Sequence, residues 1–285
     1  MKVYYIEIES CNEIAIEHEG QLYYLSSLGY DFKDINELIE SELDLFSLDY
    51  SGGKKVAKDY KILSPIVTPS QDIICVGMNY IDHIEEVEKN KEEFKHNNDA
   101  AVYFSKRANK ILATEDNIPL NDEITDKLDY EVELAVIIGK DCRRVNSREV
   151  NQYIYGFSIF NDISARDLQE KHKQWYSGKS FDGSSVMGPC ILTNNKEVDY
   201  NNLEIKTYIN DEIRQNNNTK NMIFSVNDII SDLSKKMTLK KGTIIITGTP
   251  SGVGLGYNPP KFLKTGDKIV MSIEKIGEII NYVVD

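Results

Sequence analysis

Strand-like segments that follow one another without crossover helices constrain the fold of this chain most strongly. In the last third of the chain these segments lie at residues 205–209, 243–247, 268–273 and 278–284, and most of them have no such helix between them. A regular series of parallel strands and helices is therefore excluded, because each parallel connection needs a crossover of about a dozen residues or more. The pattern predicts an α+β, mostly β fold.

The beginning of the chain has its own pattern. Three strand-like runs and one helical stretch stand there, at residues 3–8, 13–18, 22–25 and 35–42. A turn-rich segment with Pro65 and Pro69 follows, and an apolar strand comes directly after it. We therefore predict a small N-terminal α+β domain at residues 1–66 and a larger domain at residues 67–285.

The larger domain has few helical patterns. They are predicted at residues 81–95, 147–152, 165–173 and 225–235. The segment 85–99, which overlaps the first of them, is highly charged. It is either a solvated helix and loop or a lid that closes over a site.

Charge and composition exclude several classes of partner. The formal net charge of −13 argues against nucleic acid and anionic membranes, because both need a basic surface on the protein. No apolar run approaches the ~20 residues of a membrane span, and acidic residues interrupt the N-terminus where a secretory signal would be apolar. The four cysteines form no CxxC pair. We expect a cytoplasmic protein with a small-molecule partner, and oxygen ligands for any metal.

Three carboxylates at strand positions point to a metal site. Glu131 and Glu133 stand two apart in an apolar segment at residues 128–139, so one strand would project both from the same face. Two buried like charges repel unless a cation lies between them, although a solvent-facing strand would also explain the pair. Asp162 ends a second apolar run. Three such carboxylates suit Mg²⁺ or Mn²⁺, which prefer oxygen ligands.

Other charged residues stand near these positions. Arg166 and Gln169 follow Asp162 and could hold a substrate carboxylate, or Arg166 could pair with a metal ligand instead. His83 and Glu86, three apart, could form a general base with its orienting carboxylate, although a surface histidine is the simpler interpretation. Two lysines flanked by aromatic residues, Lys106 and Lys179, could stabilise an oxyanion or lie on the surface.

A glycine-rich turn follows the strand at residues 243–247. It could offer backbone N–H groups to an anion. The glycine spacing does not fit a dinucleotide-binding fingerprint, and the turn lacks the GxSxG of a serine hydrolase.

In order along the chain, five segments resemble the fumarylacetoacetate hydrolase family. They are similar to GxNYxDHxxE at residues 77–86, DYExELAxxIG at 129–139, NDxSARDxQ at 161–169, GKSFD at 178–182 and TGTPxGVG at 247–254. Each is a weak signal alone, whereas the ordered set is specific and covers about the last two-thirds of the chain. The sequence departs from the family at Arg107, where a proline is common. This difference alters specificity near the mouth of the site, or only the turn.

The resemblance implies a fold and a set of roles. The fold is a mixed β-roll or β-sandwich catalytic domain, usually in a homodimer, with a variable N-terminal domain. The implied metal ligands are Glu131, Glu133 and Asp162. The implied water-activating pair is His83 and Glu86, with Lys179 as the oxyanion-stabilising residue; Arg166, Gln169, Thr249 and Lys106 match substrate-binding positions.

The resemblance also implies a reaction class. We expect a divalent-metal-dependent hydrolase that cleaves a carbon–carbon bond in a 2,4-dioxo acid, such as an acylpyruvate or fumarylpyruvate, to pyruvate and a carboxylic acid. Oxaloacetate decarboxylation or tautomerisation, or isomerisation of 2-hydroxyhepta-2,4-diene-1,7-dioate, would use the same site. The alternative outside enzymology is a catalytically silent metal-binding scaffold.

Overall fold

The computed structural model describes residues 1–57, 59–90, 99–195 and 198–285. Its larger sheet has ten strands in the spatial order β3-β2-β1-β12-β10-β9-β15-β5-β6, with β4 paired to β1. These strands are β1 Lys2–Ile8, β2 Cys11–His18, β3 Gln21–Tyr24, β4 Lys61–Leu63, β5 Ile73–Gly77, β6 Val102–Lys106, β9 Val132–Ile138, β10 Ile154–Asp162, β12 Ser185–Thr193 and β15 Ile244–Ile246. Most neighbours in it are antiparallel, and β15 and β5 are parallel.

A five-stranded sheet packs against this large sheet. Its order is β14-β13-β16-β17-β7, formed by β7 Asn117–Pro119, β13 Glu204–Ile209, β14 Glu212–Asn218, β16 Lys268–Ile273 and β17 Gly277–Val284. Two short strands, β8 Leu128–Asp129 and β11 Ser164–Ala165, form a separate pair. The predicted α+β, mostly β fold with a sandwich-like catalytic domain is confirmed.

The central strand β9 shows why the two sheets pack together. Its side chains alternate between two apolar clusters, as the two-residue period of a strand requires. Leu134 and Val136 join a cluster that also contains Met271 of the five-stranded sheet. Ala135 and Ile137 join a second cluster on the other side. All seven residues of β9 are buried, so this strand is the centre of the core.

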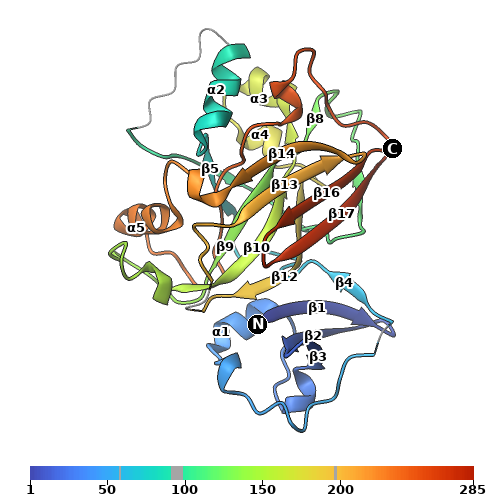
Figure 1. Ribbon diagram of the computed structural model, residues 1–285, viewed down its shortest axis with the longest axis vertical. Coiled ribbons are helices and arrows are strands. Elements are labelled where there is room, and N and C mark those ends of the chain that lie inside the picture. Colours follow the sequence, from blue (N-terminus) through green and yellow to red (C-terminus); the bar gives the residue numbers. More distant parts are fainter. Residues whose placement is uncertain (58, 91–98, 196–197) are drawn as a thin grey trace.

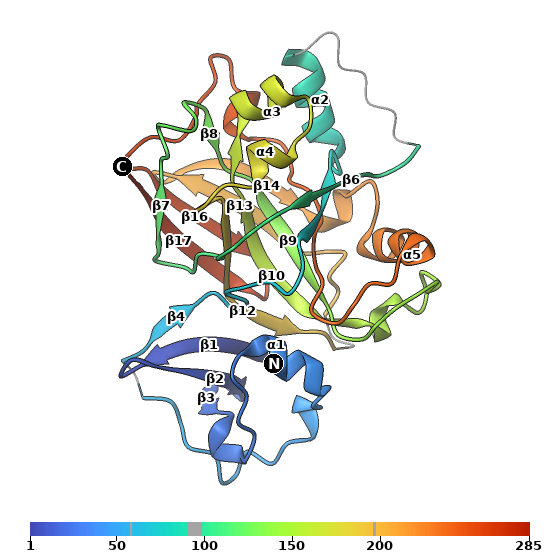
Figure 2. The same cartoon turned by 180° about the vertical axis from the view of Figure 1, so that it is seen from behind.

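The N-terminal strands belong to the same large sheet. Strand β1 pairs with β12 through Lys2↔Leu192 and Val3↔Ile191. In Figures 1 and 2 the strands β1 to β4 and helix α1 form the lower end of the molecule, opposite α2, α3 and α4. The boundary near residue 66 follows β4 and stays a prediction, because the two parts share hydrogen bonds and core.

The helices are short, and capping residues in the sequence mark the starts of α1 and α5. They are α1 Ile35–Ser41, α2 Ile81–Asn90, α3 Arg166–His172, α4 Tyr176–Lys179 and α5 Val226–Lys236, with 3-10 turns at Ser26–Leu28, Leu45–Ser47, Val150–Gln152, Thr219–Asn221 and Gly254–Gly256. Asp34 caps α1, and Ser225 forms a capping box with Asp228 at the start of α5. None of the helices that the structure describes is long and apolar enough to cross a membrane.

One expectation about a helix needs correction. The helix predicted at residues 147–152 is only the 3-10 turn Val150–Gln152. Asn146 accepts the Arg148 N–H in a local turn, which competes with a helix. Strand β14 is not among the predicted segments. Its sequence is rich in asparagine, which is rare in strands, and the strand forms because β13 pairs along it. Residues 91–95 of the helix predicted at 81–95, and residues 91–98 of the charged segment, lie outside the described part.

Candidate active site

Two neighbouring strands bring the three predicted carboxylates together. Glu133 lies within β9, opposite Phe160 of β10, and Asp162 is the last residue of β10. Glu131 precedes β9. One ligand oxygen from each of these three carboxylates lies within 4.8 Å of the others, and all three residues are buried. This cluster is an all-oxygen donor set.

The expected single strand at residues 128–139 is in fact interrupted. β8 ends at Asp129 and β9 begins at Val132. At the interruption the backbone N–H of Glu131 donates to Asn161 Oδ1 at 3.1 Å, and Glu131 O accepts from the Asp162 N–H at 2.9 Å. Both backbone groups of Glu131 are therefore hydrogen-bonded at the break, and its carboxylate lies beside that of Glu133.

Two buried cations neutralise part of this acidic cluster. The Lys179 ammonium lies 2.6 Å from Glu131 Oε2 and 2.5 Å from Asp162 Oδ2. Arg166 Nη2 lies 2.7 Å from Glu131 Oε1. Burial alone would raise the pKa of Glu131, but Lys179 and Arg166 outweigh it and hold the pKa at about 2. The same carboxylates raise the pKa of Lys179 against the effect of burial, so this lysine stays charged.

Glu133 has the opposite environment. Burial, then the charges of Asp162 and Glu131, raise its pKa well above 4.5. The backbone N–H of Gly248 donates to Glu133 Oε2 at 2.6 Å. A divalent cation would relieve this repulsion and would find hard oxygen ligands of the kind that Mg²⁺ and Mn²⁺ bind. The residues present therefore fit such an ion.

Lys106 lies behind this cluster. It is fully buried and donates to Asp162 Oδ1 at 2.7 Å, Ile163 O at 3.1 Å and Ser184 O at 2.6 Å. Its three ammonium protons are thus used within the protein, and it does not line the pocket in front of the carboxylates. The structure therefore favours a role in holding Asp162 over the predicted contact with substrate. Arg107 also lies away from the pocket lining, and its backbone N–H donates to Ser180 Oγ, which a proline could not do.

Backbone N–H groups of the glycine-rich turn at residues 247–254 donate to anions, and these anions are carboxylates of the protein itself. Gly248 donates to Glu133, and the Gly252 N–H donates to Glu86 Oε1 at 2.9 Å. Gly254 and Leu255 both donate to Asp129, at 2.7 and 3.0 Å. Gly252 has a φ of +99°, and a Cβ there would meet Arg214 O at 1.8 Å, so only glycine fits.

Asp129 is a site residue that the sequence alone did not identify. It is fully buried, accepts the N–H groups of Gly254 and of Leu255, which follows the glycine-rich turn, and pairs with Arg166 Nε at 2.8 Å. Asp129 therefore ties Arg166 to the turn. Arg166 Nη1 also donates to Gln169 Oε1 at 3.1 Å, so the predicted Arg166 and Gln169 pair lies together on α3.

His83 and Glu86 meet on the first turns of α2. His83 Nδ1 lies 3.2 Å from Glu86 Oε2. The other Glu86 oxygen is held by Gly252, as described above, so the carboxylate is fixed from two sides. With Nδ1 directed at Glu86, the second ring nitrogen Nε2 is the one available for proton transfer.

Most of these residues line one pocket of about 270 Å³. From the predicted set it includes His83, Glu131, Glu133, Arg166, Gln169, Lys179 and Thr249. Asp162 and Glu86 contact its lining residues from behind. Apolar side chains form much of the remaining wall, namely Val76, Met78, Phe104, Trp175, Leu255, Pro260 and Phe262, and Lys127 and Glu170 add charge. Pockets for small ligands commonly combine an apolar wall with a few polar groups in this way.

Comparison with known proteins agrees with this geometry. A family model described as "Fumarylacetoacetate (FAA) hydrolase C-terminal" matches residues 72–284. Oxaloacetate tautomerase YisK from Bacillus subtilis (strain 168) is 42% identical over 225 residues, which are 79% of this chain and 73% of that relative.

Two solved structures extend the likeness to the whole chain. The structure named fumarylacetoacetate hydrolase from Exiguobacterium antarcticum has a TM-score of 0.87 and 35% identity, covering 100% of this chain and 99% of the other. The structure named 2-hydroxyhepta-2,4-diene-1,7-dioate isomerase from Mycobacterium marinum has a TM-score of 0.75 and 28% identity, covering 100% and 98%. The match therefore includes the N-terminal strands as well as the catalytic fold.

Proposed function

The chain belongs to the fumarylacetoacetate hydrolase family of enzymes, and from this premise we propose that it is a divalent-metal-dependent tautomerase of oxaloacetate. One observation carries the reaction type: the oriented His83–Glu86 pair lies at a pocket that also presents Glu131, Glu133 and Lys179. A base and an electrostatic partner at one pocket are what proton transfer next to a carbonyl requires. The named activity of the relative 42% identical to the chain supports the substrate.

The residues divide the chemistry between them. Glu131, Glu133 and Asp162 would hold Mg²⁺ or Mn²⁺, which supplies Lewis-acid stabilisation of the enolate charge when bound. His83 accepts the C3 proton of the keto form at Nε2 and returns it to the 2-oxo oxygen, which gives the enol. Glu86 stabilises the protonated imidazole. Lys179, whose pKa is raised, stays charged and stabilises the negative charge that develops on the substrate.

Carbon–carbon bond hydrolysis of an acylpyruvate is the second candidate. The same His83 could take a proton from a water that attacks the distal carbonyl, so that cleavage gives pyruvate and a carboxylic acid. The apolar wall with Phe104, Trp175 and Phe262 favours this substrate, because it would fit an uncharged acyl group. Decarboxylation of oxaloacetate at the same site would differ from this hydrolysis, because it needs no attacking water.

A direct assay separates these candidates. Purified protein with Mg²⁺, with Mn²⁺ or with EDTA is mixed with oxaloacetate, acetylpyruvate or fumarylpyruvate. Loss of the enol absorbance and formation of pyruvate are followed separately. We expect metal-dependent interconversion of enol and keto oxaloacetate without matching pyruvate. Pyruvate from a dioxo acid would establish the hydrolase instead, and silence with all substrates would support a metal-binding scaffold.

The role of His83 gives this assay an internal check. The variant His83→Ala should lose roughly 10²-fold or more of the rate, the usual share of a general base. It should keep the rise in melting temperature that Mg²⁺ causes, because His83 is not among the proposed ligands. His172→Ala, an exposed histidine on α3, serves as the matched control. Equal activity of His83→Ala and the native enzyme would exclude the proton-transfer role.

A further inference from the structure

Three cations line the pocket, and two of them are paired with carboxylates at the proposed metal site. Arg166 is engaged by Asp129, Glu131 and Gln169. Lys179 is engaged by Glu131 and Asp162. Lys127 also lines the pocket. Within residues 1–57, 59–90, 99–195 and 198–285, no carboxylate forms an ion pair with its ammonium group.

Hydrogen bonds of its backbone N–H and carbonyl groups fix Lys127 at the pocket. Its N–H donates to Thr125 Oγ1 at 3.0 Å, and its carbonyl accepts from the Arg166 N–H at 3.1 Å. Thr125 in turn donates to Asp167 at 2.5 Å. Lys127 is therefore fixed beside the first residue of α3, and Arg166 in that position contacts the proposed ligand Glu131.

The positive charge of Lys127 matters because the protein as a whole is acidic. The chain has a formal net charge of −13, so a dianionic substrate is repelled at long range and needs local positive charge to bind. The proposed metal and its neighbours would neutralise the carboxylate and 2-oxo end of the substrate. The apolar wall of Phe104, Trp175 and Phe262 offers nothing to a second carboxylate.

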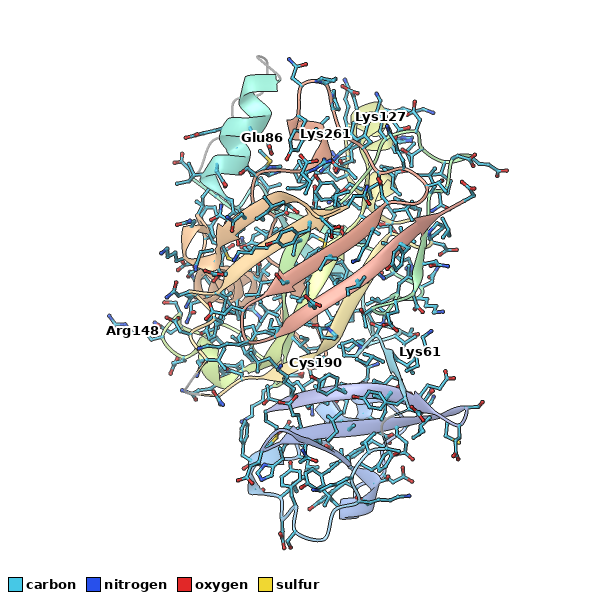
Figure 3. The ribbon with its side chains drawn as sticks, turned by 45° about the vertical axis from the view of Figure 1, so that its right-hand side comes forward. Lys61, Glu86, Lys127, Arg148, Cys190 and Lys261 are labelled. Carbon is cyan, nitrogen blue, oxygen red and sulfur yellow. The ribbon has the colours of Figure 1, made fainter. Side chains whose placement is uncertain are left out.

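We propose that Lys127 determines specificity by binding the distal carboxylate of a dicarboxylic 2-oxo acid. This inference rests on the function proposed above and narrows it, because an acylpyruvate with an uncharged acyl group would gain nothing from the ammonium. Lys127 lies beside the acid–base machinery and is not part of it. Figure 3 shows it at the same end of the molecule as Glu86 of α2 and as Lys261.

The test compares substrates and ligands that differ in the distal charge. Lys127→Met keeps most of the aliphatic stem and removes the charge. In the Mg²⁺-loaded enzyme it should raise KM for oxaloacetate roughly 10- to 100-fold, as expected for a lost charge-assisted hydrogen bond, with little change in kcat. KM for the 4-methyl ester of oxaloacetate and inhibition by oxalate should not change, because neither has a distal carboxylate. Lys127→Arg should restore much of the affinity.

Lys261→Met is the matched control. Lys261 lies near the same end of the molecule, but Glu212 at 2.9 Å and the Tyr257 ring at 4.6 Å engage its ammonium, and it does not line the pocket. This variant should keep the native KM for oxaloacetate. An equal change for oxaloacetate and its ester in Lys127→Met, or no change for either, would overturn the inference.

A binding measurement separates this inference from the proposed function. If the native enzyme does not turn over oxaloacetate, the proposed function fails. Calorimetric titration of Mg²⁺-loaded His83→Ala and of His83→Ala with Lys127→Met, using oxaloacetate and oxalate, then still decides the role of Lys127. Weaker binding of oxaloacetate alone supports the inference, and equal affinities in the two proteins contradict it.

Discussion

Glu131 and Glu133 are two residues apart, yet their carboxylates have opposite electrostatic surroundings. Lys179 and Arg166 compensate Glu131, whereas Glu133 faces two like charges. A glutamate in the unfolded chain has a pKa of 4.5, and the pKa of Glu133 in the folded protein lies well above this value. At a pH between the unfolded-state pKa and the folded-state pKa, the folded protein therefore binds more protons than the unfolded chain. Stability of the metal-free protein therefore falls as the pH rises through that window.

At the residue scale this predicts that Glu133→Gln stabilises the metal-free protein. At pH 7 we expect a melting temperature higher by roughly 2–4 °C, which corresponds to about 1 kcal/mol for a domain of this size. The gain should shrink as the pH falls toward 4.5 and vanish below it, where the native carboxyl is protonated in both the folded and the unfolded state. The same variant should lose the stabilisation by Mg²⁺ or Mn²⁺ that differential scanning fluorimetry detects in the native protein.

Glu131→Gln is the matched comparison and should behave in the opposite way. It leaves Lys179 and Arg166 buried without their shared partner, and breaking a buried ion pair on one side costs about 3–5 kcal/mol. Because its folded-state pKa is depressed, the stability that Glu131 contributes is present above 4.5 and is lost as the pH falls toward about 2. Similar melting temperatures for both variants would contradict this assignment of charges.

At the scale of elements, helix α2 carries the proposed base and is fastened to the rest of the molecule by polar contacts. Asp82 Oδ2 accepts from Ser251 Oγ and from Asn217 Nδ2, each at 2.6 Å. These contacts join the helix to the glycine-rich turn and to β14. The position of His83 therefore depends on the hydrogen bonds that the adjacent residue Asp82 accepts.

We predict that Asp82→Ala loosens α2 without disturbing the carboxylate cluster. The rate should fall roughly 10-fold or more through poorer positioning of the base, whereas the Mg²⁺-dependent rise in melting temperature persists. Limited proteolysis should cut the variant faster within α2. The control is Glu85→Ala, which removes an exposed carboxylate from the same helix and should leave both readouts unchanged. A loss of Mg²⁺ response in Asp82→Ala would show that the contact supports the whole site instead.

At the scale of the whole molecule, the N-terminal strands share a core with the catalytic sheet. Val3, Ile14 and Ile16 pack in one cluster with Ile137 of β9 and Ile191 of β12. Each fully buried side chain of this kind contributes about 1.5–3 kcal/mol. Several such contributions equal the total stability of a typical domain, about 5–15 kcal/mol.

A chain that begins at residue 67 should therefore fail to fold stably. We expect aggregation in size-exclusion chromatography and loss of the cooperative thermal transition seen by circular dichroism. In the full chain, Val3→Ser should lower the melting temperature, whereas Glu7→Ser, an exposed position on the same strand, should not. A soluble truncated protein with a native Mg²⁺ response would establish residues 1–66 as a separable domain.

The sequence by itself determined the fold class and predicted most residues of the candidate site. Short β-branched runs without crossover helices require a strand-rich fold whatever their partners are. Carboxylates on apolar strands are informative because burying a charge without a partner is expensive, and the spacing of His83 and Glu86 on one helix already predicts their contact.

Only the tertiary structure decided which charge compensates which. Asp129 and Gly254, or Lys106 and Asp162, are far apart along the chain, and their contacts depend on sheet order and register, which local periodicity does not encode. The same reason explains the pairing of β1 with β12 and the position of Lys127 at the pocket. The sequence alone does not distinguish one lysine from another, because the role of a lysine depends on which acceptors the fold places near its ammonium group.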